Sequence, residues 1–468
     1  MSKLVSTPLT VVGAGPAGIM AAYTAAELGV DVTIIDDNPF PGGQYYRKSP
    51  SEFQFENPND AFSGRKDANA ILNKLAHQKI HAIYNTSVWG VFDKHKLALA
   101  DQERSYELPT DRVILATGAY DRPFAFPGWT LPGILGAGAT LRMIKTQWVF
   151  PGKRILLAGL GPLQLALADA LVHLGAKVVC VVEAANPYKN WKQLFHIIEH
   201  PDRMQEALGY LYTLRKNKVP ILYNHAIIHA DGKDQVQQAR VAKVDNSGRL
   251  IPDPVKQYDV DAICLGYGLL PSIQLMSAFG CKLHYNPCLG WWVPEHNSMM
   301  ETSQLGIFVA GDVTNIGGSK VALLEGQIAG LTAAFQLKYI NDEAYKEKLI
   351  PLLMLHNRLD RLTNALQQIY SFRPGLLNLA TDETLICRCE EVTVGQAKEA
   401  IKQGMKDLHQ VKLATRTGMG YCQGRFCSPL VAPLIAEVTG EPLLDLLPFT
   451  VRPPIQPLPL RILASGSR

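Results

Sequence analysis

The chain has 468 residues, of which 47% are hydrophobic and 19% charged, and its formal net charge at neutral pH is +4. This length is too great for a single hydrophobic core and predicts about three domains. The small net charge and the lack of basic runs interleaved with aromatics argue against nucleic acid as a partner, and no apolar stretch reaches the ~18 residues of a membrane span.

The first predicted elements form a dinucleotide-binding unit. An apolar strand at residues 9–12 leads through a glycine-rich turn into a helix, and a second strand at residues 32–35 ends in an acid. The glycines permit a tight turn, a close approach to pyrophosphate and close helix packing, while the acid accepts ribose hydroxyls. The helix N-terminus then faces the phosphates. The predicted binding residues are Gly13, Gly15, Pro16, Ala17, Gly18 and Asp36.

Three further segments favour FAD as the dinucleotide. A loop with two adjacent glycines follows the acid, and main chain can lie against a flat ligand there. Apolar strands at residues 113–115 and 306–310 end in small residues, and the second is followed by an acid that can bind a polyol hydroxyl. A helix from about residue 320 to 334 would point its positive end at the flavin, contributing roughly 0.3 to 2 kcal/mol. The predicted contacts here are Gly43, Gln44, Arg47, Ala116, Thr117, Gly118, Gly311 and Asp312.

A weaker copy of the same unit lies between these segments. It consists of a strand at residues 154–158, a turn that contains Gly159 and Gly161, a helix to about residue 174 and a strand that ends at Glu183. Gln164 stands where a third glycine or an alanine is expected, so a side chain intrudes where helix and strand pack closely. The domain either binds NAD, which Glu183 favours over NADP, or holds another adenine nucleotide, or serves as a scaffold.

Helices are predicted in the last third of the chain. From about residue 341, apolar side chains recur at helical spacing, which indicates a connector that packs its apolar stripe on the flavin domain. His356 within it is expected to be a partly exposed polar position. Thr393 is predicted to cap a helix over residues 394–403, and another follows over residues 428–437. The stripe consists of Leu352, Leu355, Leu359, Leu362, Leu366 and Ile369.

Four cysteines near the C-terminus form two close pairs in sequence. Cys387 and Cys389 are one residue apart, and Cys422 and Cys427 follow after a gap of 32 residues. Two such pairs can close on one [2Fe-2S] cluster, because each iron takes two thiolates. Zinc would accept the same four thiolates.

The other four cysteines have no close partner in sequence, which predicts reduced thiols and a cytoplasmic protein. The chain contains no Cys-x-x-Cys motif. Disulfide reductases need a close dithiol beside the flavin, so that activity is disfavoured.

The motifs resemble known families. The FAD segments resemble the two-dinucleotide-domain flavoproteins with the glutathione-reductase-like fold. The cysteine segment resembles the bacterioferritin-associated-ferredoxin-like (BFD-like) [2Fe-2S] domain, but it has four rather than two residues between Cys422 and Cys427. Nearly the whole chain resembles the large flavoprotein component, or α subunit, of hetero-oligomeric amino-acid dehydrogenases. That family includes the large component of opine oxidase, the α subunits of D-hydroxyproline and L-proline dehydrogenases and the hydrogen cyanide synthase flavoprotein subunit. Residues 41–47 and 422–427 look closest to the opine oxidase branch.

This resemblance implies a division of labour between two subunits. A β subunit similar to D-amino-acid oxidase would oxidise the C–N bond of an opine, hydroxyproline or proline. The present chain would then relay the electrons through FAD and [2Fe-2S] to an acceptor that the sequence does not name. Two alternatives remain open: a stand-alone NADH-dependent ferredoxin-type reductase, and a non-catalytic component that binds a nucleotide for structural reasons.

The expected fold class is α/β, with two interleaved Rossmann-like domains and a small helical C-terminal BFD-like domain. The FAD-binding domain is expected to be discontinuous, because its motifs lie at both ends of the first 340 residues. The predicted bounds are 1–125 with 290–340 for the FAD-binding domain, 126–289 for the inserted second domain, 341–383 for the connector, 384–440 for the [2Fe-2S] domain and 441–468 for a tail.

Overall fold

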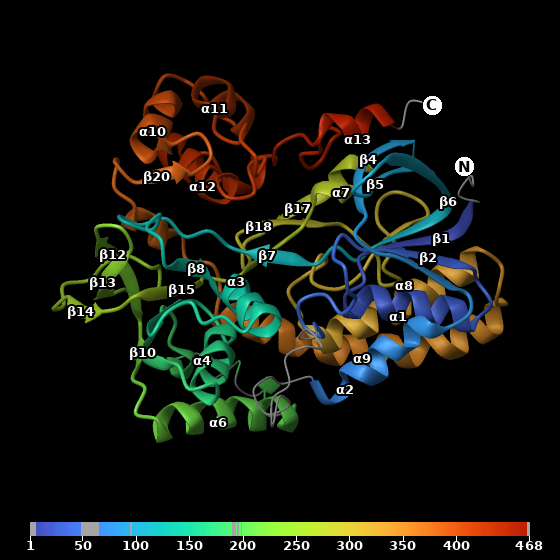
Figure 1. The fold of residues 1–468 in the computed structure, drawn as a ribbon, viewed down its shortest axis with the longest axis horizontal. Helices are drawn as coiled ribbons and strands as arrows, with labels where there is room; N and C mark the ends of the chain where they lie inside the picture. The colour runs from blue at the N-terminus through green and yellow to red at the C-terminus, as the bar shows by residue number, and fades with distance from the viewer. Residues whose placement is uncertain are drawn as a thin grey trace.

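The computed structural model describes residues 6–47, 65–93, 96–189, 193, 196–197 and 199–465 (Figure 1). It contains two α/β domains side by side and a small helical module, which we call the cysteine module, that packs on the second domain. The first domain contains both β1 (Thr7–Val12) and α8 (Ser319–Gln336), so it is discontinuous in sequence. The predicted fold class is confirmed.

The first domain is built on a seven-stranded sheet in the order β3-β2-β1-β6-β5-β4, with β19 also paired to β6. The long strand β6 pairs with β5 in antiparallel fashion at its start and with β1 and β19 in parallel at its end. The carboxyl ends of β1, β6 and β19 therefore meet at one edge of the sheet. The remaining strands are β2 (Val32–Ile35), β3 (Ile80–Ile83), β4 (Ser87–Asp93), β5 (Lys96–Ala100), β6 (Ser105–Leu115) and β19 (Ile307–Val309).

Two helices from opposite ends of this domain pack closely together. A Cβ atom at Gly326 of α8 would lie 2.1 Å from the carbonyl oxygen of Ala17, and one at Gly330 would lie 2.3 Å from that of Ala21. These glycines let α8 approach the backbone of α1, which spans Pro16–Glu27. The long helix α9 (Asp342–Ile369) packs on α8, while α2 (Arg65–Leu72) lies near α1.

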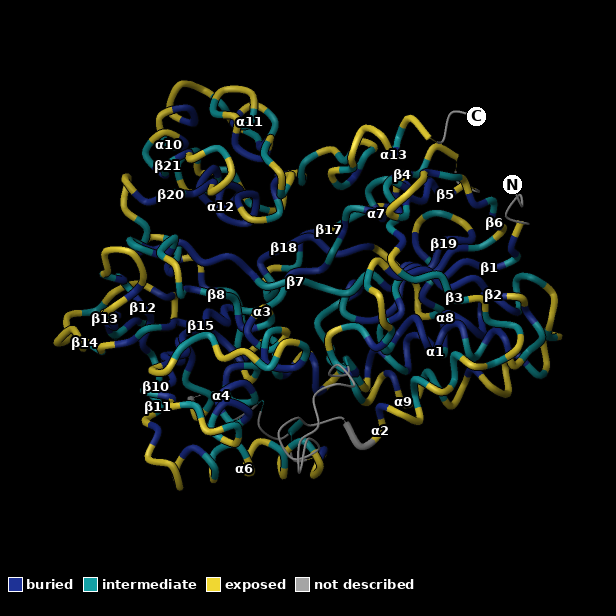
Figure 2. The backbone as a smooth tube through the Cα atoms, in the orientation of Figure 1, coloured by how far each residue is buried: buried dark blue, intermediate teal, exposed yellow. Residues whose placement is uncertain are grey.

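The second domain has a five-stranded parallel sheet in the order β11-β10-β9-β15-β8 and a three-stranded antiparallel sheet, β12-β13-β14. Figure 2 shows the central strands of both domains buried, with exposed residues along the outer helices. The strands are β8 (Ile134–Gly136), β9 (Arg154–Gly159), β10 (Lys177–Glu183), β11 (Ile221–Tyr223), β12 (His225–Gly232), β13 (Val236–Lys243), β14 (Lys256–Asp259) and β15 (Ala262–Gly266), and the helices are α3 (Ala137–Arg142), α4 (Leu163–His173) and α6 (Pro201–Lys216).

Two short strand pairs join the domains: β7 (Ala119–Asp121) with β16 (Leu269–Pro271), and β17 (Leu283–Asn286) with β18 (Trp291–Pro294). The short helix α7 (Gln274–Ala278) lies between these pairs in sequence. In this way β7 and β16 carry the chain out of the first domain and back to it.

The cysteine module contains a two-stranded sheet and three helices. The prediction that Thr393 caps a helix is confirmed, because its side chain accepts a hydrogen bond from the N–H of Gln396, whose side chain in turn bonds the N–H of Thr393. The second predicted helix is also confirmed, as α12. The elements are β20 (Leu385–Cys387), β21 (Val392–Thr393), α10 (Val394–Lys402), α11 (Leu408–Thr415) and α12 (Ser428–Thr439).

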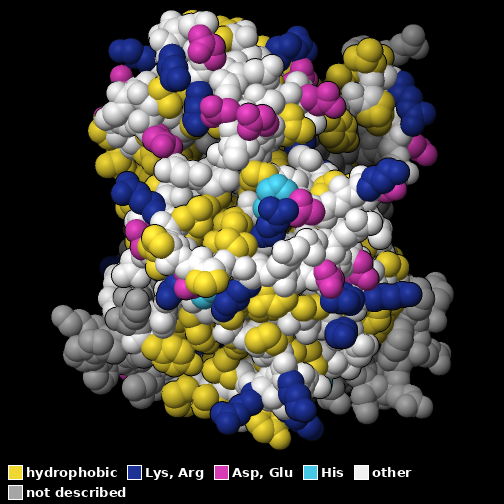
Figure 3. Space-filling model, turned by 90° about the vertical axis from the view of Figure 1, so that its left-hand side faces the viewer, with side chains coloured by type: hydrophobic (Ala, Val, Ile, Leu, Met, Phe, Trp, Pro, Cys, Tyr) yellow, Lys and Arg dark blue, Asp and Glu magenta, His cyan; other side chains and the backbone are white. Residues whose placement is uncertain are grey.

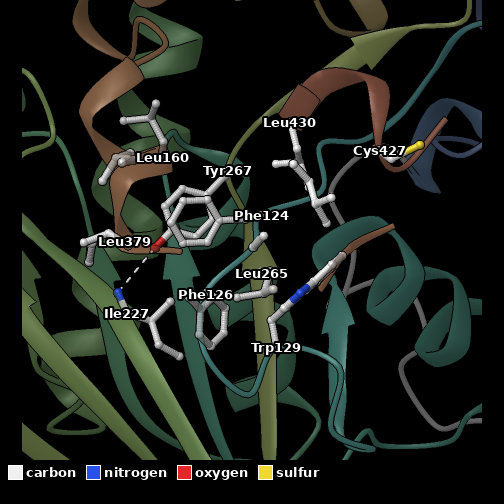
Figure 4. Packing of buried hydrophobic residues seen from close by; sticks show 14 of the residues in the cluster. Phe124, Phe126, Trp129, Leu160, Ile227, Leu265, Tyr267, Leu379, Cys427 and Leu430 are labelled. Atoms are coloured by element: carbon white, nitrogen blue, oxygen red, sulfur yellow. Dashed lines mark hydrogen bonds between the residues drawn. The ribbon is translucent and has the colours of Figure 1, made fainter. Parts of the chain in front are cut away.

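The module shares a hydrophobic core with the second domain, part of which Figure 4 shows. Phe124 stacks on Tyr267 with a centroid separation of 3.6 Å, and the indole N–H of Trp129 donates to the carbonyl oxygen of Leu385 over 2.8 Å. Buried Cys427 and Leu430 belong to the same core. The module is therefore anchored on the second domain by apolar packing.

The C-terminal segment links the cysteine module back to the first domain. The indole N–H of Trp292 donates to the carbonyl oxygen of Leu446, and the N–H of Ile455 donates to that of Trp89 on β4, over 3.0 and 2.8 Å. Ile455 is buried among apolar residues of the first domain, and α13 (Leu460–Ser465) packs near β6. This segment is thus part of the packed structure.

The connector helix α9 packs most of the predicted apolar stripe on the flavin domain but differs from expectation at two neighbouring positions. Leu355 is 47% exposed, whereas His356, expected to be partly exposed, is only 9% exposed. Leu362 and Ile369 of the predicted stripe are buried, but the buried face also carries Tyr345 and Leu349 and includes His356 in place of Leu355. In the part of the chain that the structure describes, no helix is both long and apolar enough to cross a membrane.

Candidate flavin and iron–sulfur sites

The glycine-rich turn after β1 has a backbone that side chains would disrupt. Gly13 has φ of +106°, and a Cβ atom there would lie 2.3 Å from the carbonyl oxygen of Ala116. A Cβ atom at Gly18 would lie 1.8 Å from the carbonyl oxygen of Gly13. Helix α1 follows with Gly15 as its N-cap and no side-chain cap. Its first N–H groups are thus available to an anion such as a pyrophosphate.

Asp36 at the end of β2 organises this turn. Its buried carboxylate accepts hydrogen bonds from the N–H of Ala14 over 2.6 Å and from the N–H and side-chain amide of Asn38, each over 2.8 Å. The guanidinium of Arg47 donates to the side-chain oxygen of Asn38 and to the carbonyl oxygen of Gly43, each over 3.1 Å. The predicted residues Asp36, Gly43 and Arg47 are therefore brought together.

The loop that carries Gly43 lies directly on the glycine turn. A Cβ atom at Gly43, where φ is +59°, would lie 2.9 Å from the Cα atom of Gly15. Two glycines thus face each other at the position predicted for a flat ligand. The neighbouring side chain of Gln44 is exposed.

The other predicted FAD segments line the same edge of the sheet. The hydroxyl of Thr117 donates to the carbonyl oxygen of Ser272 over 3.2 Å, and Gly118 has φ of +66°. One oxygen of Asp312 accepts from the N–H of Gly318, the N-cap of α8, over 3.1 Å. Burial, assisted by the charge of Glu325, raises the pKa of Asp312 to about 6, against the lowering effect of that N–H group.

Sequence reasoning missed the acid that supports this loop from behind. Glu325, the one acidic residue of α8, is 3% exposed and accepts from the N–H of Gly311 over 2.7 Å and from the hydroxyl of Thr314 over 2.9 Å. Its other oxygen lies 3.2 Å from Nε2 of His356, whose Nδ1 lies 3.4 Å from Asp360. The sequence signal that could have revealed Glu325 is that it is the single acidic residue in an otherwise largely apolar helix.

His356 is charged more readily in this setting than in water. Burial lowers its pKa, but the hydrogen bond to Glu325 and the charges of Asp360 and Glu325 together raise the pKa above its ordinary value. His356 was expected to be partly exposed, but it is buried because the buried carboxylate of Glu325 needs a cationic or donating partner.

Lys145 was also missed, because its position depends on an irregular helix. Residues Met143–Gln147 form a π-helical turn that buries Lys145. Its ammonium lies 3.4 Å from the carbonyl oxygens of Gln44 and Tyr45, in the loop that lies on the glycine turn. Short π-helical stretches are frequent at functional sites.

The residues at this edge fit FAD. Two glycines with positive φ, an uncapped helix N-terminus and a carboxylate at the end of β2 gather around the carboxyl ends of β1, β6 and β19. An added Cβ atom would fill the cradle at Gly13, Gly18 and Gly43. When FAD is bound, it supplies two-electron redox chemistry at the isoalloxazine.

The four cysteines of the cysteine module lie as two close pairs. The thiol of Cys427 donates to the sulfur of Cys387, and the thiol of Cys422 donates to the sulfur of Cys389. The pairs come from opposite ends of the sequence motif, so the fold brings both halves together. Gly420 permits this approach, since a Cβ atom there would lie 2.2 Å from Cβ of Cys389.

The cysteine thiols differ in their pKa, and hence in how readily each forms a thiolate. The hydrogen bond from Cys427 lowers the pKa of Cys387 to about 5, and N–H groups of Gly418 and Glu390 assist against burial. The same bond raises the pKa of Cys427. Cys387 and Cys427 are buried, while Cys389 is exposed.

The donor set fits a [2Fe-2S] cluster. Each iron in such a cluster takes two thiolates, which two sulfur pairs can supply. Among the described residues, no three His, Cys, Asp or Glu side chains are placed to hold a single metal ion. When bound, the cluster supplies one-electron chemistry.

The second glycine turn has a different shape from the first. Gly161, with φ of +119°, donates its N–H to Glu183 over 3.0 Å, and Gln164 donates its side-chain amide to the same carboxylate over 3.3 Å. The N–H of Ala185 donates to the other oxygen over 2.8 Å. Both oxygens of Glu183 are thus engaged inside the protein, and burial raises its pKa to about 8.

The connector after α9 lies across this second turn. The ring of Tyr370 is 4.0 Å from where a Cβ atom at Gly161 would be. The guanidinium of Arg373 donates to the carbonyl oxygens of Ala184 and Asp245 over 2.7 and 3.3 Å. Tyr370 and Arg373 of this connector thus lie at the edge where a dinucleotide binds to a doubly wound sheet.

Comparisons with known proteins agree with both sites. Residues 7–336 match the family model for pyridine nucleotide-disulphide oxidoreductases, and residues 385–437 match that for BFD-like [2Fe-2S] binding domains. The large component of opine oxidase from Agrobacterium tumefaciens is 32% identical over 97% of this chain and 91% of its own length. Hydrogen cyanide synthase subunit HcnB of Pseudomonas aeruginosa is 30% identical over 96% of each chain.

A solved structure shows a similar fold. The L-proline dehydrogenase from P. horikoshii superposes with a TM-score of 0.70 and 23% identity, covering 98% of this chain and 79% of its own. This similarity extends through the dinucleotide-binding domains and the cysteine module.

Proposed function

Because the chain belongs to the pyridine nucleotide-disulphide oxidoreductase family of FAD flavoproteins and carries a BFD-like [2Fe-2S] domain, we propose that it relays electrons within a hetero-oligomeric amino-acid dehydrogenase. The substrate class is an amino acid with a secondary amine, such as an opine, hydroxyproline or proline. A D-amino-acid-oxidase-like partner subunit oxidises it. The names of the relatives, as subunits of an opine oxidase and of a hydrogen cyanide synthase, support a partner.

The observation that carries the proposal is that strand β7 leads from the predicted flavin edge to the surroundings of the cysteine pairs. Gly118 ends the segment at the flavin edge, and Tyr120 follows two residues later on β7. Burial raises the pKa of the Tyr120 phenol, and the charges of Cys422 and Cys427 raise it further. One short stretch of backbone therefore leads from the predicted flavin edge towards the cysteines, which supports a relay between the two sites.

The proposed roles of the residues follow the geometry. The glycine turn and Asp36 hold the FAD dinucleotide, the 116–118 segment lies beside it, and Asp312 with the N-terminus of α8 follows β19 at the same edge of the sheet. The four cysteines hold the cluster: Cys387, Cys389, Cys422 and Cys427.

The electron balance requires both kinds of carrier. Oxidation of a secondary amine to an imine releases two electrons and two protons, and water then cleaves the imine to a carbonyl compound and a primary amine. A two-electron acceptor followed by a one-electron carrier passes these electrons on singly, so the carrier must turn over twice per amine. The cysteine module packs on the second domain and is linked to the flavin domain by the C-terminal segment, and it is suited to the second task.

Surface composition supports a partner protein. Leu208 and Tyr212 on α6 are 59% and 68% exposed, and Tyr421 beside the cysteine pair is 80% exposed. Figure 3 shows apolar side chains gathered over the lower half of the face that it presents. Exposed apolar groups of this kind are typical of interaction sites.

We also propose a cytoplasmic location. None of the eight cysteines forms a disulfide, which fits a reducing compartment.

The test uses the native complex, purified through this chain with its partner retained. Octopine, nopaline, proline and hydroxyproline are added separately under anaerobic conditions, and the visible spectrum of the flavin is recorded. We expect one of these amines to bleach the flavin in the complex. The isolated chain should not respond to the same amine.

NADH provides the discriminating control. Rapid bleaching of the isolated chain by NADH, together with no response of the complex to any amine, would contradict the proposal and favour a stand-alone reductase. Bleaching of the isolated chain by the amine itself would contradict the requirement for a partner.

A further inference from the structure

A buried cation without a carboxylate partner lines the same small cavity as Pro429, which follows Cys427 by two residues. Arg122, directly after β7, is 7% exposed. Its guanidinium donates to the carbonyl oxygen of Leu289, lies 3.5 Å from that of Gly290 and packs 4.7 Å from the ring centroid of Phe372. Among the described residues, no Asp or Glu forms a salt bridge with it. A buried charge with neutral partners alone is costly and needs a counter-charge.

The neighbouring Tyr120 has a buried hydroxyl that lacks a hydrogen-bond partner in the described part of the chain. Strand β7 is paired with β16, which places Tyr120 opposite Leu270 and fixes its backbone. The phenol interacts with Arg122 and Arg425 and with two cysteines, Cys422 and Cys427. Burial raises the pKa of Tyr120, so the hydroxyl keeps its proton and remains a donor.

Arg425 repeats the pattern on the cysteine loop itself. Its guanidinium donates to the carbonyl oxygens of Cys422 and Ile455, over 3.3 and 3.2 Å. Both acceptors are neutral. By contrast, Arg416 in the same module is paired with Glu390 over 2.8 Å, and its side chain is 69% exposed.

We propose that Arg122, Arg425 and the hydroxyl of Tyr120 form a shell that stabilises the negative charge of the [2Fe-2S] cluster. A cluster with four thiolates is anionic, and reduction adds one further negative charge. Two uncompensated guanidinium groups and one free hydroxyl donor supply the opposite charge and a hydrogen bond to sulfur. Such groups favour the reduced cluster and therefore raise its reduction potential.

The charge shell acts on the cluster whichever partner supplies the electrons. Its role rests on the proposed relay and deepens it, because a raised cluster potential makes electron transfer from the flavin more favourable. The two can fail separately: the potential is measured with a chemical reductant, whereas the relay is tested with an amine and the partner.

The experiment is a redox titration of the full-length, cluster-loaded chain, followed by the paramagnetic signal of the reduced cluster. Iron, sulfide and FAD contents are measured for each variant. Arg122→Met is expected to lower the potential by about 59 mV or more, which is a tenfold smaller ratio of reduced to oxidised cluster at fixed potential. Tyr120→Phe is expected to lower it by less and to change the shape of the signal.

Arg416→Met is the matched control, because it removes an arginine of the same module that already has a carboxylate. Its potential should equal that of the wild type. If Arg122→Met does not fold or does not hold the cluster, Tyr120→Phe decides, since it removes only a hydroxyl without a partner. A wild-type potential and signal in Tyr120→Phe, with full iron content, would overturn the inference.

Discussion

The carboxylate of Glu325 accepts a hydrogen bond from the backbone N–H of Gly311 over 2.7 Å, so a buried charge on α8 holds the loop at the end of β19. Behind it, Nε2 of His356 lies 3.2 Å from the second carboxylate oxygen. The loop predicted to contact the flavin is thus supported by a pair of titratable groups on two helices.

His356→Gln should make stability depend less on pH. The raised pKa of His356 means that its contribution is fully present below about pH 6.5, its unfolded value, and is lost as the pH rises through the folded value. At about pH 6 the variant should lose about 1.5–3 kcal/mol of unfolding free energy, a range typical of hydrogen bonds to charged groups. Denaturant titrations at several pH values measure this.

The control for that series is His284→Gln, because His284 is exposed. Its unfolding free energy should follow that of the wild type at every pH. Equal losses in His356→Gln at low and high pH would show that the ion pair does not set the pH dependence.

Gly13→Ala should abolish FAD binding, with at least a tenfold lower flavin content after purification. A Cβ atom there would lie 2.3 Å from a backbone carbonyl oxygen, in addition to the strain of a positive φ. Gly404→Ala isolates the strain, since Gly404 has φ of +104° and no atom within 4 Å of an added Cβ. This control should lose about 1–2 kcal/mol and keep its flavin. Similar flavin contents in the two variants would refute the steric argument.

Glu183→Gln should stabilise the protein at alkaline pH. Burial raises the pKa of Glu183 to about 8, so its stabilising contribution is present below about pH 4.5 and is lost as the pH rises through 8. The variant lacks this titration. Its free energy of unfolding relative to the wild type should therefore grow by up to about 1.4 kcal/mol per pH unit between about pH 4.5 and about pH 8. Thermal unfolding of both proteins between about pH 5 and about pH 9 measures the trend. Glu347→Gln, at an exposed position of α9, should show no such trend.

Cys389→Ser should remove the cluster without removing FAD. Cys389 is exposed and pairs with Cys422, so the change deletes one proposed ligand with little disturbance of the core. Iron and sulfide contents should fall at least tenfold, while the flavin spectrum persists. Cys288→Ser, far from the cysteine pairs in sequence, should retain both cofactors. A variant that keeps full iron content would exclude Cys389 as a ligand.

Much of the flavin site could be predicted from the sequence because local backbone requirements determine it. Gly13, Gly15 and Gly18 lie within one turn, and the acid that follows the next strand has a fixed place beside them. The four cysteines were equally visible from their spacing, but their pairing in space was not. The structure pairs Cys387 with Cys427 and Cys389 with Cys422, across the two halves of the motif. The helix cap at Thr393 is another local signal that the structure confirms.

The supporting groups could not be predicted, because they depend on tertiary packing. Glu325 and His356 come from separate helices and are 31 positions apart. Lys145 reaches the flavin loop only because a π-helical turn rotates it inward. Tyr370 covers the second glycine turn from a connector far away in sequence, which no periodicity indicates.

The measurement that tests the central proposal most directly follows the cluster itself while an amine is oxidised. The complex of this chain with its partner is mixed anaerobically with the amine that bleaches the flavin, and the paramagnetic signal of the reduced cluster is recorded. The account predicts that this signal develops in the complex and is absent when the isolated chain receives the same amine. Loss of the amine and bleaching of the flavin with no cluster signal would contradict the relay.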